Sequence, residues 1–526
     1  MALETAAEST IEQNLEQFLL VLAISLSVAT SSRIFVWLRQ IPYTLLLVIV
    51  GLILAFVDVR LVNLSPELIL ENFLPPLLFE AAWNLKWRDL FRELVPVTLY
   101  AVFGVIISIV GIGVALNQLA GMALPIALLV GASLAATDPV SVVALFRELG
   151  AGKRLTTLME GESLFNDGVA VVAFGLLVGI PLGPEEFNIP TTIARFFVVV
   201  GVGIGVGSLI GFGISYLTQR FDLPLVEQSL TLVSAYGTYI ITENFGGSGV
   251  IGVVTVGVIL GNFGSRIGMN PRTRLIVTEF WDFLAFFVNS IVFLVIGDQI
   301  KYASLGNNLS LIAITIGAVI LTRAIAVYGL GSLSNWLAKS EIGIREQTVI
   351  WWGGLRGSVA IALALSVPQS IPERSVIIDI IFGVVLFTLL VQGLTTQIFL
   401  EKLGLIGEQQ PLRQKYLEAV ARRIALNRVL NYLSQAKQYQ EFDSEYCRYQ
   451  AELIEGQCQT IELEITQMHQ QYPNLRTLVR EQLQDQLLSI EADTYAELIG
   501  AGQLDNKLSP LLTEIVAAGE ENLDEL

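Results

Sequence analysis

Cysteine and histidine are nearly missing from this sequence. Two cysteines and one histidine occur in 526 residues, and all three lie late in the chain, at Cys447, Cys458 and His469. The residues before them therefore offer neither a disulfide framework nor a cluster of sulfur and imidazole ligands. We expect no cofactor and no transition metal.

Charged residues are also scarce. They make up 15% of the sequence, against 53% hydrophobic residues, and the mean hydropathy is +0.64. A soluble protein of this length needs roughly a quarter charged residues, so most of this chain has the lipid bilayer as its solvent. The net charge of −17 argues against nucleic acid as a partner. The segment from Lys402 onward, with 11 basic and 20 acidic residues, carries about half of that charge.

Long apolar runs follow one another through the first three quarters of the chain. Runs of roughly 17–25 apolar residues can cross a bilayer as helices. We predict about thirteen such spans, and counts of twelve and fourteen are also compatible with the interruptions. Their approximate ranges are 16–32, 41–57, 66–85, 93–118, 123–149, 158–181, 190–219, 225–244, 248–263, 276–298, 308–337, 346–366 and 375–400.

Basic residues are distributed unevenly between the loops that join these spans. With the N-terminus outside, fourteen lysines and arginines fall in inner loops and four in outer loops. This positive-inside bias predicts a cytoplasmic C-terminus. We divide the chain into an N-terminal segment (1–15), a transmembrane domain (16–401) and an acidic cytoplasmic tail (402–526). A multi-pass protein of the plasma membrane is expected, with an intracellular membrane as the alternative.

The tail changes character along its length. It first contains RQKYLEAVARRIALNRVLNYL, a basic, amphipathic stretch typical of a helix on the inner membrane surface. Acidic, glutamine-rich helical patterns follow. We expect either a solvated helical tail or a regulatory or dimer-associated module.

Ionisable groups within the spans mark candidate functional sites, because a charge in hydrocarbon is costly. The sixth span contains GESLFNDGVAVV. Since an α-helix turns about 100° per residue, Ser163 and Asp167 share one face. Glu162 and Asn166 share another, and the two carboxylates diverge by roughly 140°. We therefore expect Asp167 to face a cavity and Glu162 to need a partner elsewhere.

Two arginines lie within predicted spans, Arg356 in the twelfth and Arg323 in the eleventh. We predict a buried ion pair between Glu162 and Arg356, because a guanidinium and a carboxylate match in a planar, bidentate geometry. Arg323 is expected to have a structural role with a partner that the sequence does not identify.

The fifth span is interrupted within TDPVSVVALF. Pro139 removes a backbone donor and moves Asp138 out of helical geometry, which frees carbonyl groups near Thr137. Glycines around Arg356 predict a second interruption in the twelfth span. The two spans are seven apart in order and so cross in opposite directions, the pattern of an inverted repeat with a midplane site.

Glu80 is a further acid within the third span. It follows two prolines in FLPPLLFEAA. Two readings stay open for it, an acid near the membrane interface or another oxygen ligand.

Together these motifs resemble those of the sodium/proton antiporters of the monovalent cation–proton antiporter superfamily. More narrowly they resemble the branch with an Asn-Asp pair in the sixth helix. The similarity covers roughly residues 10–400 and not the tail. It implies an all-α polytopic fold with an inverted repeat, crossed and broken fifth and twelfth helices, and a homodimer. It also implies a part in pH homeostasis and salt tolerance.

The resemblance further implies a role for each polar residue. Asp167 would bind the cation and the proton, and Asn166 would stand where the electrogenic branch has a second aspartate. One cation would then exchange for one proton without net charge movement. Glu162 and Arg356 would form the ion pair. The remaining oxygen ligands of the cation would be Thr137, Asp138, Ser163 and Glu80.

An oxygen-only site suits a hard cation such as Na⁺. Competition between Na⁺ and H⁺ for Asp167, with alternating exposure, gives exchange without a separate coupling device. The sequence leaves Li⁺ and K⁺ open, so a K⁺/H⁺ antiporter of the same fold is the alternative. A passive channel would need rings of carbonyls or acids along a path, and acids at the site argue against an anion transporter. We expect a secondary transporter, not an enzyme.

Overall fold

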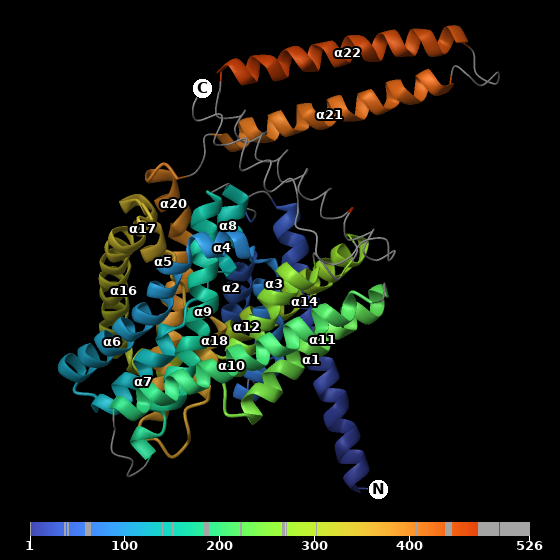
Figure 1. The fold of residues 1–526 in the computed structure, drawn as a ribbon. Coiled ribbons are helices and arrows are strands. Elements are labelled where there is room, and N and C mark those ends of the chain that lie inside the picture. Colours follow the sequence, from blue (N-terminus) through green and yellow to red (C-terminus); the bar gives the residue numbers. More distant parts are fainter. Residues whose placement is uncertain are drawn as a thin grey trace. The chain divides into compact units, whose positions relative to one another are not determined.

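The computed structural model describes most of the chain. The described residues are 2–35, 38, 41–57, 61, 65–138, 140–149, 152–182, 189–220, 223–265, 269, 271–300, 302–405, 409–436, 444–471 and 494. Every regular element among them is a helix. The chain divides into two units, Met1–Leu405 and Ile406–Leu526, and Figure 1 shows their helices.

Helices lie in each of the thirteen predicted ranges of the first unit. Several ranges contain two or three consecutive elements, some of them π-helical. In chain order the elements are α1 (Ala2–Ile34), α2 (Tyr43–Phe56), η1 (Leu68–Phe73), α3 (Leu74–Asn84), α4 (Trp87–Arg92), α5 (Leu94–Thr98), η2 (Leu99–Gly104), α6 (Val105–Ala120), α7 (Leu124–Ala135), α8 (Val140–Leu149), α9 (Lys153–Leu177), η3 (Ile180–Leu182), α10 (Ile189–Thr218), α11 (Pro224–Asn244), α12 (Gly249–Ile259), η4 (Leu260–Gly264), α14 (Pro271–Asp298), α15 (Tyr302–Asn307), α16 (Leu309–Ala338), α17 (Ile344–Trp352), α18 (Ser358–Leu365), α19 (Arg374–Phe387), η5 (Thr388–Gly393) and α20 (Leu394–Lys402).

Five continuous helical stretches among the described residues are long and apolar enough to cross a bilayer. Each has 26–30 residues, and at 1.5 Å per residue this is about 40 Å, more than the hydrocarbon thickness of about 30 Å. The count of thirteen crossings stays a prediction. The five stretches are Leu94–Ala120, Pro190–Thr218, Thr273–Asp298, Leu309–Ala338 and Arg374–Lys402.

Two glycines bring α2 and α14 into backbone contact. A Cβ atom on Gly51 would overlap the carbonyl oxygen of Leu294, and one on Gly297 would overlap the carbonyl oxygen of Val48. Small residues permit this close approach, which supplies van der Waals contact where lipid offers no hydrophobic driving force.

Substitution of Gly297 should therefore loosen the α2–α14 contact. We expect Gly297→Ala to lower the melting temperature of the purified protein clearly, because backbone atoms cannot give way. Gly317→Ala in α16 is the matched control, since a Cβ there meets no atom within 4 Å. Equal melting temperatures for the two variants would show that the contact is not close in solution.

The fifth and twelfth predicted spans are both interrupted, as the sequence predicts. α7 ends at Ala135, the chain is extended at Ala136, and α8 begins at Val140; Pro139 lies outside the described residues. Residues 353–357 separate α17 from α18. The two interruptions meet, because the Asp138 N–H donates to the Leu355 carbonyl at 2.8 Å.

The second unit contains two long helices, α21 (Gln409–Ala436) and α22 (Ser444–Gln471), which lie side by side (Figure 1). A small buried cluster joins them, formed by Tyr416 and Ala419 from α21 and by Ile465 and Met468 from α22. The Tyr416 ring also faces the ring of His469, with 5.3 Å between centroids. The predicted acidic end of the tail lies outside the described residues.

Candidate ion-binding site

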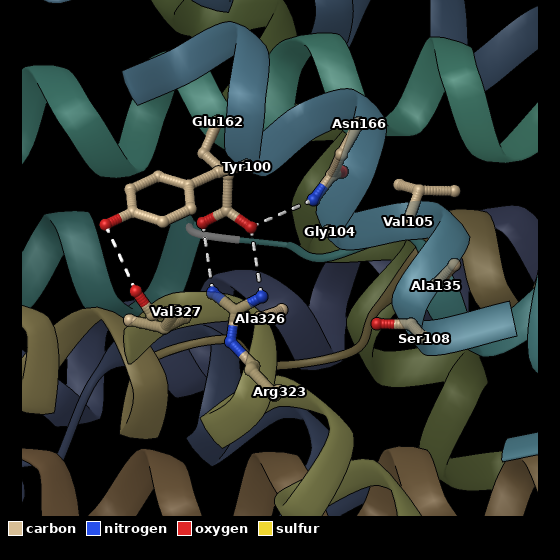
Figure 2. A pocket seen from close by; sticks show the side chains of 10 residues that line it. All are labelled: Tyr100, Gly104, Val105, Ser108, Ala135, Glu162, Asn166, Arg323, Ala326 and Val327. Carbon is tan, nitrogen blue, oxygen red and sulfur yellow. Dashed lines mark hydrogen bonds and ion pairs between the residues drawn. The ribbon is translucent and has the colours of Figure 1, made fainter. Parts of the chain in front are cut away.

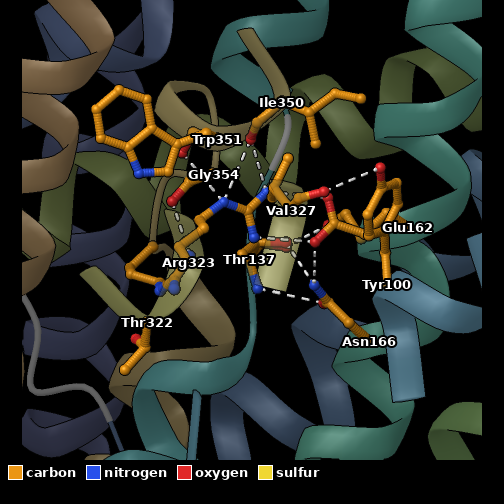
Figure 3. A network of polar contacts seen from close by, with 12 residues as sticks. Tyr100, Thr137, Glu162, Asn166, Thr322, Arg323, Val327, Ile350, Trp351 and Gly354 are labelled. Atoms are coloured by element: carbon orange, nitrogen blue, oxygen red, sulfur yellow. Dashed lines mark hydrogen bonds and ion pairs between the residues drawn. The ribbon is translucent and has the colours of Figure 1, made fainter. Parts of the chain in front are cut away.

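Glu162 on α9 forms a bidentate ion pair with Arg323 on α16 (Figure 3). Its two carboxylate oxygens each lie 3.0 Å from a guanidinium nitrogen. The predicted pair between Glu162 and Arg356 is wrong. The sequence shows that Glu162 needs a guanidinium, but not which of two arginine-bearing helices packs against its face.

Arg323 is also tied to the interrupted twelfth span. Its Nη2 donates to the Ile350 carbonyl at 3.0 Å, and its Nε donates to the Trp351 carbonyl at 3.2 Å. These carbonyl groups belong to the last turn of α17 and have no partner within that helix. Arg323 therefore links α9, α16 and the end of α17, which supports the structural role expected for it.

Arg356 lies within the interruption and is 1% exposed. Its Nη1 donates to the Gly354 carbonyl at 2.7 Å, and its backbone N–H donates to the Thr388 hydroxyl at 3.1 Å. Its Nε has no hydrogen-bond partner among the described residues. Arg356 is thus hydrogen-bonded to the chain break through Gly354 and to η5 through Thr388.

Asn166 holds the unwound end of α7 (Figure 3). Its Oδ1 accepts from the Thr137 N–H at 3.2 Å, and its Nδ2 lies 2.5 Å from the Thr137 hydroxyl. The same Nδ2 is 3.4 Å from Glu162, which confirms that Glu162 and Asn166 share a helix face. The Ser163 hydroxyl donates to the Thr137 carbonyl. Buried backbone groups need such partners, and α9 supplies them where α7 has stopped.

Asp138 lies where two helices begin. Its Oδ1 accepts from the Val140 N–H at 3.0 Å, and its carboxylate also bonds the backbone N–H of Ser358, the first residue of α18. Helix N-termini favour a negative charge because their first N–H groups have no helical partner. Backbone N–H groups at both interruptions thus hold the Asp138 carboxylate in place.

Asp167 lies one turn beyond Ser163 on α9. It is 8% exposed, and its Oδ1 is buried with no hydrogen-bond partner in the described part of the chain. The charged groups around it are those of Asp138, Glu162 and Arg356. A buried carboxylate oxygen without a partner is costly, so this position suits a bound proton or cation.

Comparison with known proteins identifies the family. The model of the transmembrane sodium/hydrogen exchanger family matches residues 21–402. The chain belongs to this family. The exchanger is 64% identical to the Na⁺/H⁺ antiporter ApNhaP of Aphanothece halophytica over 99% of its own length and 100% of that relative. It is 60% identical to the low-affinity Na⁺/H⁺ antiporter NhaS1 of Synechocystis, over 96% of its own length and 97% of the relative.

A solved structure shows the same fold. The sodium proton antiporter MjNhaP1 of Methanocaldococcus jannaschii, at pH 8, matches with a TM-score of 0.61 at 21% identity. The match covers 75% of the exchanger and 100% of MjNhaP1. The chain thus has the fold of this antiporter. Its membership of the sodium/hydrogen exchanger family makes it a membrane transporter and not an enzyme.

A small pocket opens on the other face of α9 (Figure 2). Glu162, Asn166, Arg323 and Tyr100 are among the residues that line it, and it has room for about one water molecule. The Tyr100 hydroxyl donates to the Val327 carbonyl at 3.4 Å. Sequence reasoning missed Tyr100, although a phenol in the fourth predicted span was a visible signal.

Glu80 in α3 has a partner one turn away. The Asn84 amide lies 2.6 Å from its Oε1 and 3.1 Å from the Asp282 carboxylate of α14. These contacts connect Glu80 to α14 through Asn84. Its place among the cation ligands stays a prediction.

The atoms at the interruptions that could act as ligands of a cation are oxygens. Among the described residues, no three histidine, cysteine, aspartate or glutamate side chains come together as a group that could hold a metal ion. Carboxylate, hydroxyl and carbonyl oxygens suit a hard cation. For the exchanger, such a cation is substrate and not a resident cofactor.

Proposed function

We propose that the exchanger is a secondary antiporter that exchanges one Na⁺ for one H⁺ across the membrane without net charge movement. The buried, unpartnered Oδ1 of Asp167 beside the chain breaks carries this proposal. The printed names of ApNhaP and NhaS1, both Na⁺/H⁺ antiporters, support the two substrates. Exchange of K⁺ or Li⁺ at the same site is the alternative.

In this mechanism the proton and Na⁺ compete for the Asp167 carboxylate. When the proton leaves, Na⁺ takes its place, with Ser163 Oγ, the Thr137 carbonyl and Asp138 as further oxygen ligands. Ser163 uses its proton on the Thr137 carbonyl, so its oxygen lone pairs remain for a cation. Glu80 is the remaining candidate ligand.

The side chain of Asn166 sets the charge balance. It is neutral, and both ends of its amide are used on Thr137. Asp138 accepts hydrogen bonds from two backbone N–H groups, and the proposal assigns the exchange of a proton for Na⁺ to Asp167 alone. Only Asp167 then changes its ligand, and each exchange replaces one positive charge with another.

Alternating exposure would follow from movement of the joined interruptions. The α7–α8 and α17–α18 breaks share a backbone hydrogen bond, so we infer that they move together as the core of an inverted repeat. The homodimer is part of the proposal because the resemblance to the antiporter superfamily implies it. The uneven distribution of basic residues supports about thirteen crossings in the plasma membrane and a cytoplasmic C-terminus.

Proton movement in proteoliposomes tests the proposal. Na⁺ is added outside, and the internal pH is followed with the membrane potential clamped and then released. We expect equal rates in the two conditions. A rate that depends on potential would contradict the electroneutral assignment of Asn166. A response to K⁺ but not to Na⁺ would keep the mechanism and change the substrate.

Ser163→Ala should weaken Na⁺ binding more than it slows turnover. The variant loses an oxygen ligand and frees the Thr137 carbonyl. A single hydrogen bond of about 1 kcal/mol corresponds to roughly a fivefold loss of apparent Na⁺ affinity. The control is Ser234→Ala, since the Ser234 hydroxyl is buried and donates within its own helix, to the Thr231 carbonyl. Unchanged affinity for Ser163→Ala would make Ser163 a packing residue only.

A further inference from the structure

The two helices of the second unit carry opposite charge. α21 has five basic residues and one acidic residue, a net charge of +4, whereas α22 has one basic and five acidic residues, a net charge of −4. The ion pair described between them joins Arg423 to Glu462, at 4.0 Å. Most of the charge therefore points away from the contact, and the hairpin has one basic side and one acidic side.

The basic side also has exposed apolar groups. Ile424, Val429 and Tyr432 of α21 are 47%, 44% and 64% exposed. The side chain of Arg422 is 69% exposed and forms a surface ion pair at 3.3 Å with the exposed Glu418, which lipid phosphates would compete for. At 100° per residue, Arg422, the three apolar residues and the exposed Arg428 lie on the side of α21 away from the buried cluster. We call these five residues the outer face of α21.

We propose that the outer face of α21 binds the anionic lipid surface of the membrane in which the exchanger is embedded. A helix with arginines beside tyrosine and aliphatic side chains is suited to the headgroup region, where the apolar groups enter the interface and the arginines meet phosphates. The proposal does not depend on which ions are exchanged.

The short segment between α20 and α21 makes even weak binding of α21 to lipid effective. Six residues, 403–408, separate the end of α20 from the start of α21. Such a short tether holds α21 at a high local concentration next to the bilayer. The acidic charge of α22 on the other side of the hairpin orients it, because an anionic surface attracts α21 and repels α22.

A second copy of the chain fits the outer face less well. Two outer faces brought together would place Arg422 and Arg428 of each copy near those of the other, and like charges in contact are unfavourable.

The binding of the hairpin to lipid should weaken at high salt, because the Debye length falls from about 10 Å at 0.1 M to about 3 Å at 1 M. The second unit would then respond to the ionic strength beside the membrane.

The test uses the full chain in nanodiscs. Cys447→Ser and Cys458→Ser remove the native thiols, and a fluorophore is attached through Tyr432→Cys, with Glu455→Cys on α22 as the matched control. Quenching by headgroup spin labels is compared in zwitterionic discs and in discs with phosphatidylglycerol. We expect strong quenching at position 432 only with phosphatidylglycerol and at low salt. Little quenching is expected at position 455.

A charge variant completes the test. Arg422→Gln with Arg428→Gln should lower the lipid-bound to free ratio by roughly fivefold per arginine. Absence of quenching at position 432 in every lipid would overturn the proposal. Equal quenching of the label at position 432 in zwitterionic discs would also overturn it. So would energy transfer between two labelled chains in every lipid, because it would show that a second copy covers the outer face of α21.

Discussion

Asp167→Asn is expected to reduce Na⁺-driven proton movement to the level of empty liposomes, while the protein still folds. The amide cannot bind a proton at working pH and offers no charge to Na⁺, so neither half of the exchange has a ligand. Removal of the single exchanging group should leave no partial activity. Proton flux in proteoliposomes is the measurement, at saturating Na⁺ and across a range of pH.

Two controls separate loss of the site from loss of the fold. Melting temperature and size-exclusion profile should match those of the unsubstituted protein, since the Asp167 Oδ1 has no hydrogen-bond partner to lose within the described chain. Glu401→Gln, at an exposed position of α20, should keep exchange activity. Robust exchange by a well-folded Asp167→Asn variant would refute Asp167 as the shared binding group.

The second large effect concerns the Glu162–Arg323 pair. Arg323→Gln should lower the free energy of unfolding by about 3–5 kcal/mol, because it leaves a buried carboxylate without its countercharge. Denaturation of the purified protein in detergent micelles measures the loss.

A double-mutant cycle identifies the partner of Glu162. Glu162→Gln combined with Arg323→Gln should be less unstable than the sum of the single variants, because both buried charges are removed together. The same cycle with Arg356→Gln should show much weaker coupling. Stronger coupling to Arg356 than to Arg323 would reverse the pairing seen in the structure.

Much of the fold could be predicted from the sequence. Apolar runs of membrane length identify the helical ranges because the bilayer leaves few alternatives for the backbone. The interruptions were predictable from glycine and proline. The hydrogen bond that joins Asp138 to Leu355 was not, because contacts between breaks far apart in the chain depend on packing. The approach of Gly51 to Gly297 was hidden for the same reason.

The site was predictable to the extent that one helix determines it. The angle of 100° per residue correctly separated Glu162 from Asp167 and placed Asn166 beside Glu162. The partner of Glu162 required knowledge of which helix faces α9, and the sequence offered two arginines in equivalent surroundings. The amide contacts of Asn166 with Thr137 could not be predicted because they depend on where the unwound segment lies.

The link between the two interruptions has a consequence for how such transporters can diverge. It is made by the backbone N–H of Asp138 and the backbone carbonyl of Leu355, so it does not depend on either side chain. Replacement of neighbouring side chains can change the size and number of oxygen ligands while this junction persists. Ion preference can therefore evolve, or be engineered, on a scaffold whose central connection is independent of residue identity.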